Sequence, residues 1–270
     1  MKILCQGWFT HKSRFNLNSE ILLYPIAIAY FWLKQNKPLN RMWLINFLTS
    51  SIGKKLVMSL TGLFLVSFLV IHLLGNLQLL VSDGGKSFNI YAKFMTTNPV
   101  IKFISIGLYA GILLHAIQGF LIWLSNKKAK GSNYAVSTNA NGSWMSKNMG
   151  LLGLFILFFL CVHMGDFWYK MKFTDQIAMV DYDGVVVKDL YHRVYTAFQN
   201  IWIVIIYLIG LLALGLHLIH GFQSAFTTLG LRHKKYTPLI KMTGLGIAII
   251  IPLLYAAIPL FVLIKDASNY

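Results

Sequence analysis

Glutamate is almost absent from this chain: Glu20 is the only one, and eight acidic residues stand against 24 lysines and arginines. This scarcity argues against a catalytic pair of carboxylates. The two cysteines, Cys5 and Cys161, lie far apart, which argues against a disulfide framework and against a zinc site. Charged residues make up only 12% of the chain and hydrophobic residues 57%, with a mean hydropathy of +0.63. This composition is typical of an integral membrane protein.

The formal net charge of +16 is the one feature that could indicate nucleic-acid binding. However, the lysines and arginines gather in short segments between apolar runs, which is the pattern of a membrane topology signal. We therefore expect membrane lipid around the protein and no nucleic-acid partner.

Five segments reach the length of about 20 mainly apolar residues that a membrane-spanning helix needs. They are Leu56–Val81, Val100–Ser125, Met149–Trp168, Ile201–Thr228 and Met242–Ile264. The predicted fold class is therefore all-α integral membrane, with five transmembrane helices. Pro252 and Pro259 are expected to kink the last helix, which neighbouring helices can accommodate.

The loops predict the orientation, because Lys and Arg collect on the cytoplasmic side. Basic clusters precede the first span and follow the second and the fourth, which favours a cytoplasmic N-terminus and an outer C-terminus in a bacterial inner membrane. The longest outer loop, residues 173–200, is expected to carry a short amphipathic piece. The clusters are Lys54 and Lys55; Lys127, Lys128, Lys130 and Lys147; and Arg232, Lys234, Lys235 and Lys241.

Residues 1–41 stand apart from the domain predicted for residues 42–270. Their apolar stretch, Ile21–Leu33, has 13 residues, too few to span at a rise of about 1.5 Å each, and no signal-peptide cleavage site follows it. Met42 begins a stretch that leads directly into the first span. The segment is interpreted as a misassigned start, with an interfacial amphipathic arm as the alternative.

Four histidines lie inside four different spans, where ionisable groups are rare and usually functional. At a rise of about 1.5 Å per residue, His72 and His163 lie about 24 and 21 Å from the inner face. His115 and His217 lie about 15 and 16 Å from it. The four histidines therefore share two levels. This predicts that four of the five helices form a haem-binding bundle with two stacked irons, each held by two imidazoles, which suits electron transfer better than oxygen chemistry.

Other residues near these histidines are weaker candidates. Glycines one helical turn away, Gly75, Gly119 and Gly221, leave a shallow surface for a flat macrocycle; alternatively, they only let helices approach closely. His220, one turn inward of His217, competes with it as the inner ligand or bonds a haem propionate.

The segments around the histidines resemble a known family, the five-helix, di-haem cytochrome b subunit of succinate dehydrogenase and fumarate reductase. The likeness covers residues 42–270, with all five spans in order, and is greatest to the b558-type anchors of Bacteroidetes-like bacteria. The segments that carry it are IGKKLVMSLTG, VIHLLGN, LLHAIQG, CVHMGDFW and LGLHLIHGFQSAF.

The resemblance implies a non-catalytic, electron-transferring subunit that binds two haem b groups. It would anchor a flavoprotein subunit with FAD and an iron–sulfur subunit on the cytoplasmic face, and would relay electrons between the iron–sulfur clusters and a quinone, expected to be menaquinone. The family pairing implies His72 with His163 and His115 with His217, in agreement with the two levels.

Two departures from the family bear on proton transfer. Gly215 stands where some fumarate reductases have a glutamate, which slightly favours succinate oxidation, and the family's quinone-site acid has no clear match. Asp166, the only carboxylate near a span interior, is a candidate for protonating quinone on the outer side; alternatively, it is a solvated cap. Two other functions stay open: the di-haem anchor of a hydrogenase or formate dehydrogenase, and a haem-free transporter or proton channel with histidine relays.

Overall fold

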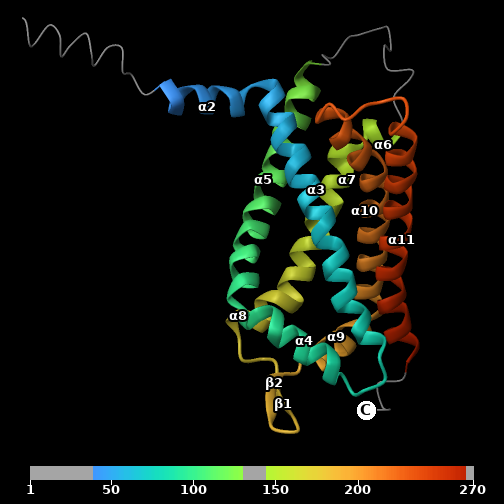
Figure 1. The fold of residues 1–270 in the computed structure, drawn as a ribbon. Coiled ribbons are helices and arrows are strands. Elements are labelled where there is room, and N and C mark those ends of the chain that lie inside the picture. Colours follow the sequence, from blue (N-terminus) through green and yellow to red (C-terminus); the bar gives the residue numbers. More distant parts are fainter. Residues whose placement is uncertain (1–38, 130–143, 266–270) are drawn as a thin grey trace, which may run out of the picture. The chain divides into compact units, whose positions relative to one another are not determined.

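The computed structural model describes residues 39–129 and 144–265 (Figure 1). The chain divides into two units, residues 1–49 and 50–270. In the first unit, helix α2 spans Leu39–Thr49 and exposes Trp43, Ile45 and Leu48. Met42 lies within α2; the rest of the predicted arm, residues 1–38, lies outside the described residues.

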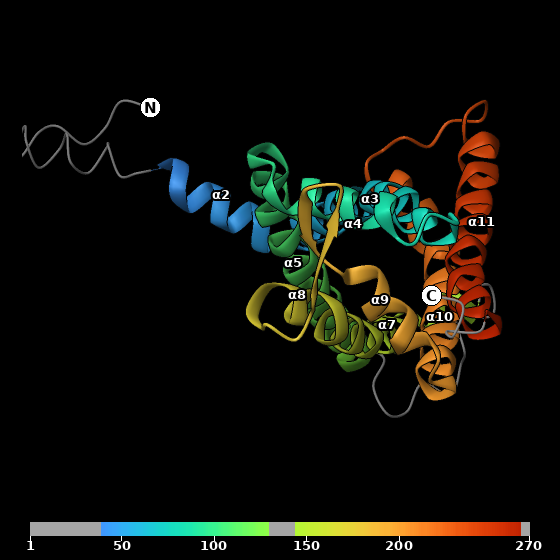
Figure 2. The same cartoon turned by 90° about the horizontal axis from the view of Figure 1, so that it is seen from below.

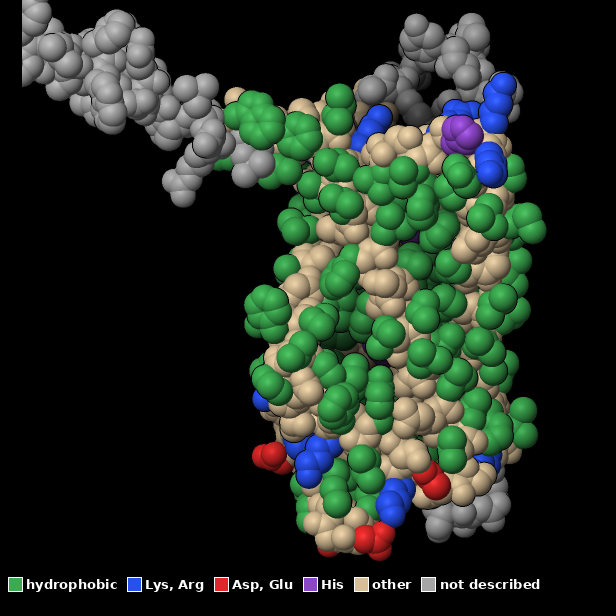
Figure 3. All heavy atoms as spheres, viewed as in Figure 1, with side chains coloured by type: hydrophobic (Ala, Val, Ile, Leu, Met, Phe, Trp, Pro, Cys, Tyr) green, Lys and Arg blue, Asp and Glu red, His purple; other side chains and the backbone are tan. Residues whose placement is uncertain are grey.

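In the second unit, five helices are long and apolar enough to cross a membrane, which confirms an all-α, multi-pass membrane protein. On the side shown in Figure 3, hydrophobic side chains cover the length of these helices and charged side chains gather at their ends. The spans are α3 (Ser51–Asn76) with its 3₁₀ turn (Leu77–Leu80); α5 (Pro99–Ala129); α7 (Met149–His163), continued by a π-helical stretch (Met164–Tyr169) and α8 (Lys170–Phe173); α10 (Ile201–Thr228); and α11 (Thr237–Ile264).

The first and fifth spans begin earlier than their hydropathy predicts, at Ser51 and Thr237 rather than at Leu56 and Met242. Apolar runs identify the part of a helix that lies in lipid, whereas capping decides where the helix begins. At α3 the cap is Ser50, whose Oγ accepts a hydrogen bond from the backbone N–H of Gly53 at 3.0 Å. α11 continues as one helix through two buried prolines.

Helix α10 packs against α11, α7 and α3, and α3 in turn packs against α5. Two glycines of α10 permit these close approaches. Gly210 faces the ring of Phe159 on α7, and Gly215 faces the carbonyl oxygen of Ala248 on α11. Pro252 has no N–H to donate to that carbonyl, so the approach of Gly215 covers an oxygen that the helix ladder leaves unbonded.

Three short elements lie across one end of the spans, as the view in Figure 2 shows; this is the end that the sequence predicts to be outer, and these elements are called the outer cap. They are α4 (Lys86–Thr97), an antiparallel hairpin of β1 (Met179–Tyr182) and β2 (Val185–Lys188), and α9 (Leu190–Phe198). Helix α9 is the amphipathic piece expected between residues 173 and 200: it buries Tyr191, Val194, Tyr195, Ala197 and Phe198. The hairpin and α4 were not predicted.

Asn89, which is 1% exposed, holds this outer cap together. Its Nδ2 donates to Asp189 Oδ1 at 2.9 Å and to Tyr182 Oη at 3.1 Å, and its Oδ1 accepts the backbone N–H of Tyr191 at 2.9 Å. These bonds join α4 to the hairpin and to α9. Below them, Tyr195 Oη donates to the carbonyl of Leu79 at 3.1 Å, which ties the cap to the first span.

Candidate functional site

The four predicted histidines meet as two pairs. His72 of α3 lies beside His163 of α7, with ring centres 5.8 Å apart and ring planes at 67°. His115 of α5 lies beside His217 of α10, with ring centres 6.2 Å apart and planes at 65°. These are the pairs that both the depth along each span and the family resemblance predicted.

The spacing within each pair fits two imidazoles on opposite sides of one metal ion. An imidazole nitrogen binds a metal at about 2 Å and the ring centre lies about 1 Å beyond it, so the ring centres of two axial ligands are about 6 Å apart. No cluster of three or more His, Cys, Asp or Glu occurs in the described ranges, 39–129 and 144–265. Two protein ligands for each metal suit a haem, whose macrocycle supplies the other four.

The hydrogen bond between Tyr255 and His72 favours the tautomer that a metal ligand needs. Tyr255 Oη donates to the carbonyl of Leu69 at 2.8 Å, and a tyrosine hydroxyl has one proton. The same oxygen lies 2.9 Å from His72 Nδ1 and can therefore only accept a proton from it. With Tyr255 as the partner, the proton of the neutral imidazole is on Nδ1 and Nε2 keeps the lone pair that binds a metal; Asn76 Nδ2, 3.1 Å from the same Nδ1, would favour the opposite tautomer.

His115 is arranged in the same way by a threonine. Thr61 Oγ1 donates to the carbonyl of Val57 at 2.7 Å, within α3. That oxygen lies 3.1 Å from His115 Nδ1, so it also acts as the acceptor for the ring N–H. A metal-binding histidine commonly uses its second nitrogen in this way, which orients the ring and raises its basicity.

The other two histidines have different surroundings. Phe159 stacks on His163 with ring centres 5.6 Å apart, and Tyr207 Oη lies 3.2 Å from His163 Nδ1. His217 Nδ1 is buried without a hydrogen-bond partner among the described residues. His220 is half-buried one turn inward of His217; the ring that pairs with His115 is that of His217.

Only one of the three predicted glycines lies against a histidine of the two pairs. A Cβ on Gly221 would lie 3.8 Å from His217 Cδ2, whereas one on Gly75 would lie 2.5 Å from Cε1 of Tyr91 and one on Gly119 3.0 Å from Cε of Met58. At these two positions side chains occupy the space next to the glycine.

Gly62 is a residue of the site that the sequence reasoning missed. A Cβ at this position would lie 3.2 Å from Cε1 of His115, so the absence of a side chain makes room for the imidazole. Counting positions did not indicate it, because Gly62 lies only six residues, or about 9 Å, past the predicted start of the first span at Leu56, whereas His115 was placed about 15 Å from the inner face.

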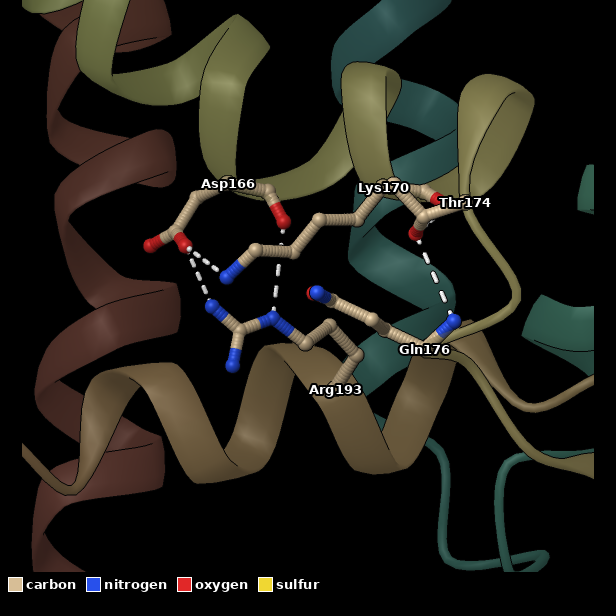
Figure 4. A network of polar contacts seen from close by, with 5 residues as sticks. All are labelled: Asp166, Lys170, Thr174, Gln176 and Arg193. Atoms are coloured by element: carbon tan, nitrogen blue, oxygen red, sulfur yellow. Dashed lines mark hydrogen bonds and ion pairs between the residues drawn. The ribbon is translucent and has the colours of Figure 1, made fainter.

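Asp166 forms an ion-pair network with two cations in the π-helical stretch that continues α7 toward the cap (Figure 4). Its Oδ1 accepts from Lys170 Nζ at 3.0 Å and from Nη2 of Arg193 on α9, while its backbone carbonyl accepts from Arg193 Nε at 3.4 Å. The carboxylate side chain is 16% exposed, so it is not the solvated cap of the alternative interpretation. It lies in the π-helical stretch that directly follows His163, and such stretches are frequent at functional sites.

No family model, curated protein or solved structure matches this chain. The function is therefore argued from the two histidine pairs and their surroundings.

Proposed function

We propose that this chain is the haem b-bearing membrane anchor of a succinate:quinone oxidoreductase, relaying electrons between an iron–sulfur subunit and menaquinone. The two histidine pairs are the observation that supports this most. Four spans each contribute one imidazole, and the ring-centre separation in each pair, 5.8 or 6.2 Å, suits two ligands that share one iron. The family resemblance of residues 42–270 supplies the identity of the complex.

A haem b held by two of these histidines would supply reversible one-electron transfer. The protein's part is to bind, orient and enclose. His72 and His163 would hold the iron of the outer haem, and His115 and His217 that of the inner haem. Tyr255 and Thr61 hold the Nδ1–H of one ligand in each pair, so that Nε2 points its lone pair away from the hydroxyl.

The charge distribution supports a cytoplasmic site for the soluble subunits. In the described ranges, all six acidic residues lie at or beside the end that carries the cap. At the opposite end of the described part of the chain, every residue with a formal charge is a lysine or an arginine. A basic inner end is the positive-inside pattern of a bacterial inner-membrane protein. The flavoprotein and iron–sulfur subunits are assigned to that end, and menaquinone to the end with Asp166.

Asp166 remains the candidate for quinone protonation, now with Lys170 and Arg193 as its partners. Some fumarate reductases of the family have a glutamate at the position of Gly215, and the packing around Gly215 supports a different proton route in this chain. A Cβ there would lie 3.0 Å from the carbonyl oxygen of Ala248, so a longer side chain requires α10 and α11 to separate. The direction favoured for the complex is succinate oxidation.

Spectroscopy of the purified protein tests the proposal. We expect two haems per chain and a b-type α band in the reduced-minus-oxidised spectrum. His72→Gly and His163→Gly should remove the outer haem, His115→Gly and His217→Gly the inner one, and added imidazole should restore each. His192→Ala, at an exposed position on α9, is the control that should keep both.

A folded protein without a b-type band would refute the proposal and favour a histidine-relay transporter. Co-purification decides between the two classes of di-haem anchor: hydrogenase or formate dehydrogenase subunits in place of a flavoprotein and an iron–sulfur protein would assign the chain to a different complex.

A further inference from the structure

Helix α11 is the one span without a histidine, yet it reaches the outer pair through Tyr255. The tyrosine hydroxyl crosses from α11 to α3, where it contacts both the Leu69 carbonyl at 2.8 Å and His72 Nδ1 at 2.9 Å. Its ring centre lies 5.7 Å from that of His72. The fifth span therefore contacts the candidate ligand directly.

We propose that Tyr255 is a positioning residue that fixes the metal-binding tautomer of His72 and lowers the reduction potential of the outer haem. This rests on the proposed function, because it concerns the iron that His72 would hold. The Leu69 carbonyl takes the only hydroxyl proton, so Tyr255 Oη accepts the N–H of His72. Such a bond makes the imidazole a stronger electron donor through Nε2, and a stronger donor favours ferric over ferrous iron.

Asn76 is the competing partner of His72. Its Nδ2 lies 3.1 Å from His72 Nδ1 and 2.7 Å from the carbonyl of the same residue. If this amide donated to Nδ1, the imidazole proton would have to be on Nε2, and the ring could not bind iron through that nitrogen. The tautomer of His72 thus shows whether Tyr255 or Asn76 is the hydrogen-bond partner of its Nδ1.

Thr61 provides an internal comparison, because its hydroxyl holds His115 by the same arrangement on the inner pair. Its proton is committed to the Val57 carbonyl at 2.7 Å, and Oγ1 lies 3.1 Å from His115 Nδ1. The two hydroxyls come from different helices and touch different pairs. Each should therefore influence the potential of one haem and not of the other.

The experiment is a potentiometric titration of both haems, with electron paramagnetic resonance of the ferric forms, on the intact complex. Tyr255→Phe should raise the potential and shift the ferric signal of the outer haem alone, and Thr61→Val those of the inner haem alone. Tyr109→Phe removes a hydroxyl that contacts Trp168 instead of a histidine, and should shift neither. Two bound haems with unchanged potential and signal of the outer haem in Tyr255→Phe would overturn the inference.

A second measurement does not require haem. Nitrogen NMR of the full chain with labelled histidine should show His72 with its proton on Nδ1, and Tyr255→Phe should reduce that form. A proton on Nε2 in the wild type would overturn the inference and identify Asn76 as the partner. Wild-type protein without haem would refute the proposed function, whereas the tautomer would still test the role of Tyr255.

Discussion

Gly210→Ala should separate two of the spans that carry the histidine pairs. A Cβ at this position in α10 would lie 2.6 Å from Cγ, 2.7 Å from Cδ2 and 2.8 Å from Cβ of Phe159 on α7. Ordinary contacts between carbon atoms are about 3.5–4.0 Å long, so the shortfall to Cβ is about 0.7 Å or more. Rotating the ring does not move the Cβ of Phe159, so the helices themselves must shift.

The expected cost of this overpacking is about 1–3 kcal/mol of the free energy of unfolding. The matched control is Gly153→Ala, in α7, where a Cβ would meet nothing within 4 Å. Both variants gain about 1 kcal/mol of helix propensity, so the difference between them isolates the clash. Unfolding of both variants in mixed micelles measures that difference.

The displaced ring also has a spectroscopic consequence. Phe159 stacks on His163 with ring centres 5.6 Å apart and ring planes at 24°, so Gly210→Ala should disturb the proposed outer haem before the proposed inner one. Equal stability of the two alanine variants, together with unchanged haem signals, would refute the close α7–α10 contact on which this reasoning depends.

Three further predictions concern the outer cap. Gly85→Ala should destabilise it by about 2–6 kcal/mol, seen as faster amide exchange in the cap alone, because this residue has a φ of +82° and its Cβ would lie 2.3 Å from Cγ of Tyr191. The hydrogen bond from Lys86 lowers the pKa of the Asp183 carboxyl below its ordinary value of 3.8. The contribution of this ion pair to the stability of the folded protein is therefore fully present above pH 3.8 and is lost as the pH falls through the lowered pKa. A pH titration of Asp183 followed by carbon NMR should show the lowered pKa, and Lys86→Met should restore the ordinary value. An ordinary pKa in the wild type would contradict the prediction. Asp166→Asn should loosen α9 by about 1–3 kcal/mol, measured by exchange of its amides; unchanged exchange would show that the ion pairs contribute nothing.

The spans were predictable because lipid restricts the backbone so strongly. Without water, the backbone N–H and C=O groups in the bilayer must be satisfied inside the protein, in this class of protein almost all of them within helices, so a long apolar run is enough to identify a span. The ends were less predictable: α3 begins five residues before its apolar run, at a cap formed by Ser50. The hairpin was missed although its signal was readable, since Asp183–Gly184, with φ of 54° and 87°, is a two-residue hairpin turn.

Helix α4 shows what a local pattern does not reveal. Its Asn89 is buried by bonds to Tyr182, Asp189 and Tyr191, about a hundred residues further along the chain. Nothing near Asn89 in the sequence indicates these partners, because they lie in the hairpin and at the start of α9, which the tertiary structure brings next to α4.

In the candidate site, too, some features were predictable from the sequence and others were not. Rise per residue is constant in a helix, so counting positions was enough to place four histidines at two levels and to predict their pairing. Which groups orient those rings depends on the packing of separate helices: Tyr255 reaches His72 across 183 positions, and Gly62 makes room for His115 from another span. The sequence by itself determined the spans and the two levels that the imidazoles share along them; which end of the spans faces the cytoplasm stays a prediction. The tertiary structure alone decided the hydroxyl partners, the open glycine and the cations beside Asp166, because these depend on which helix sides face one another.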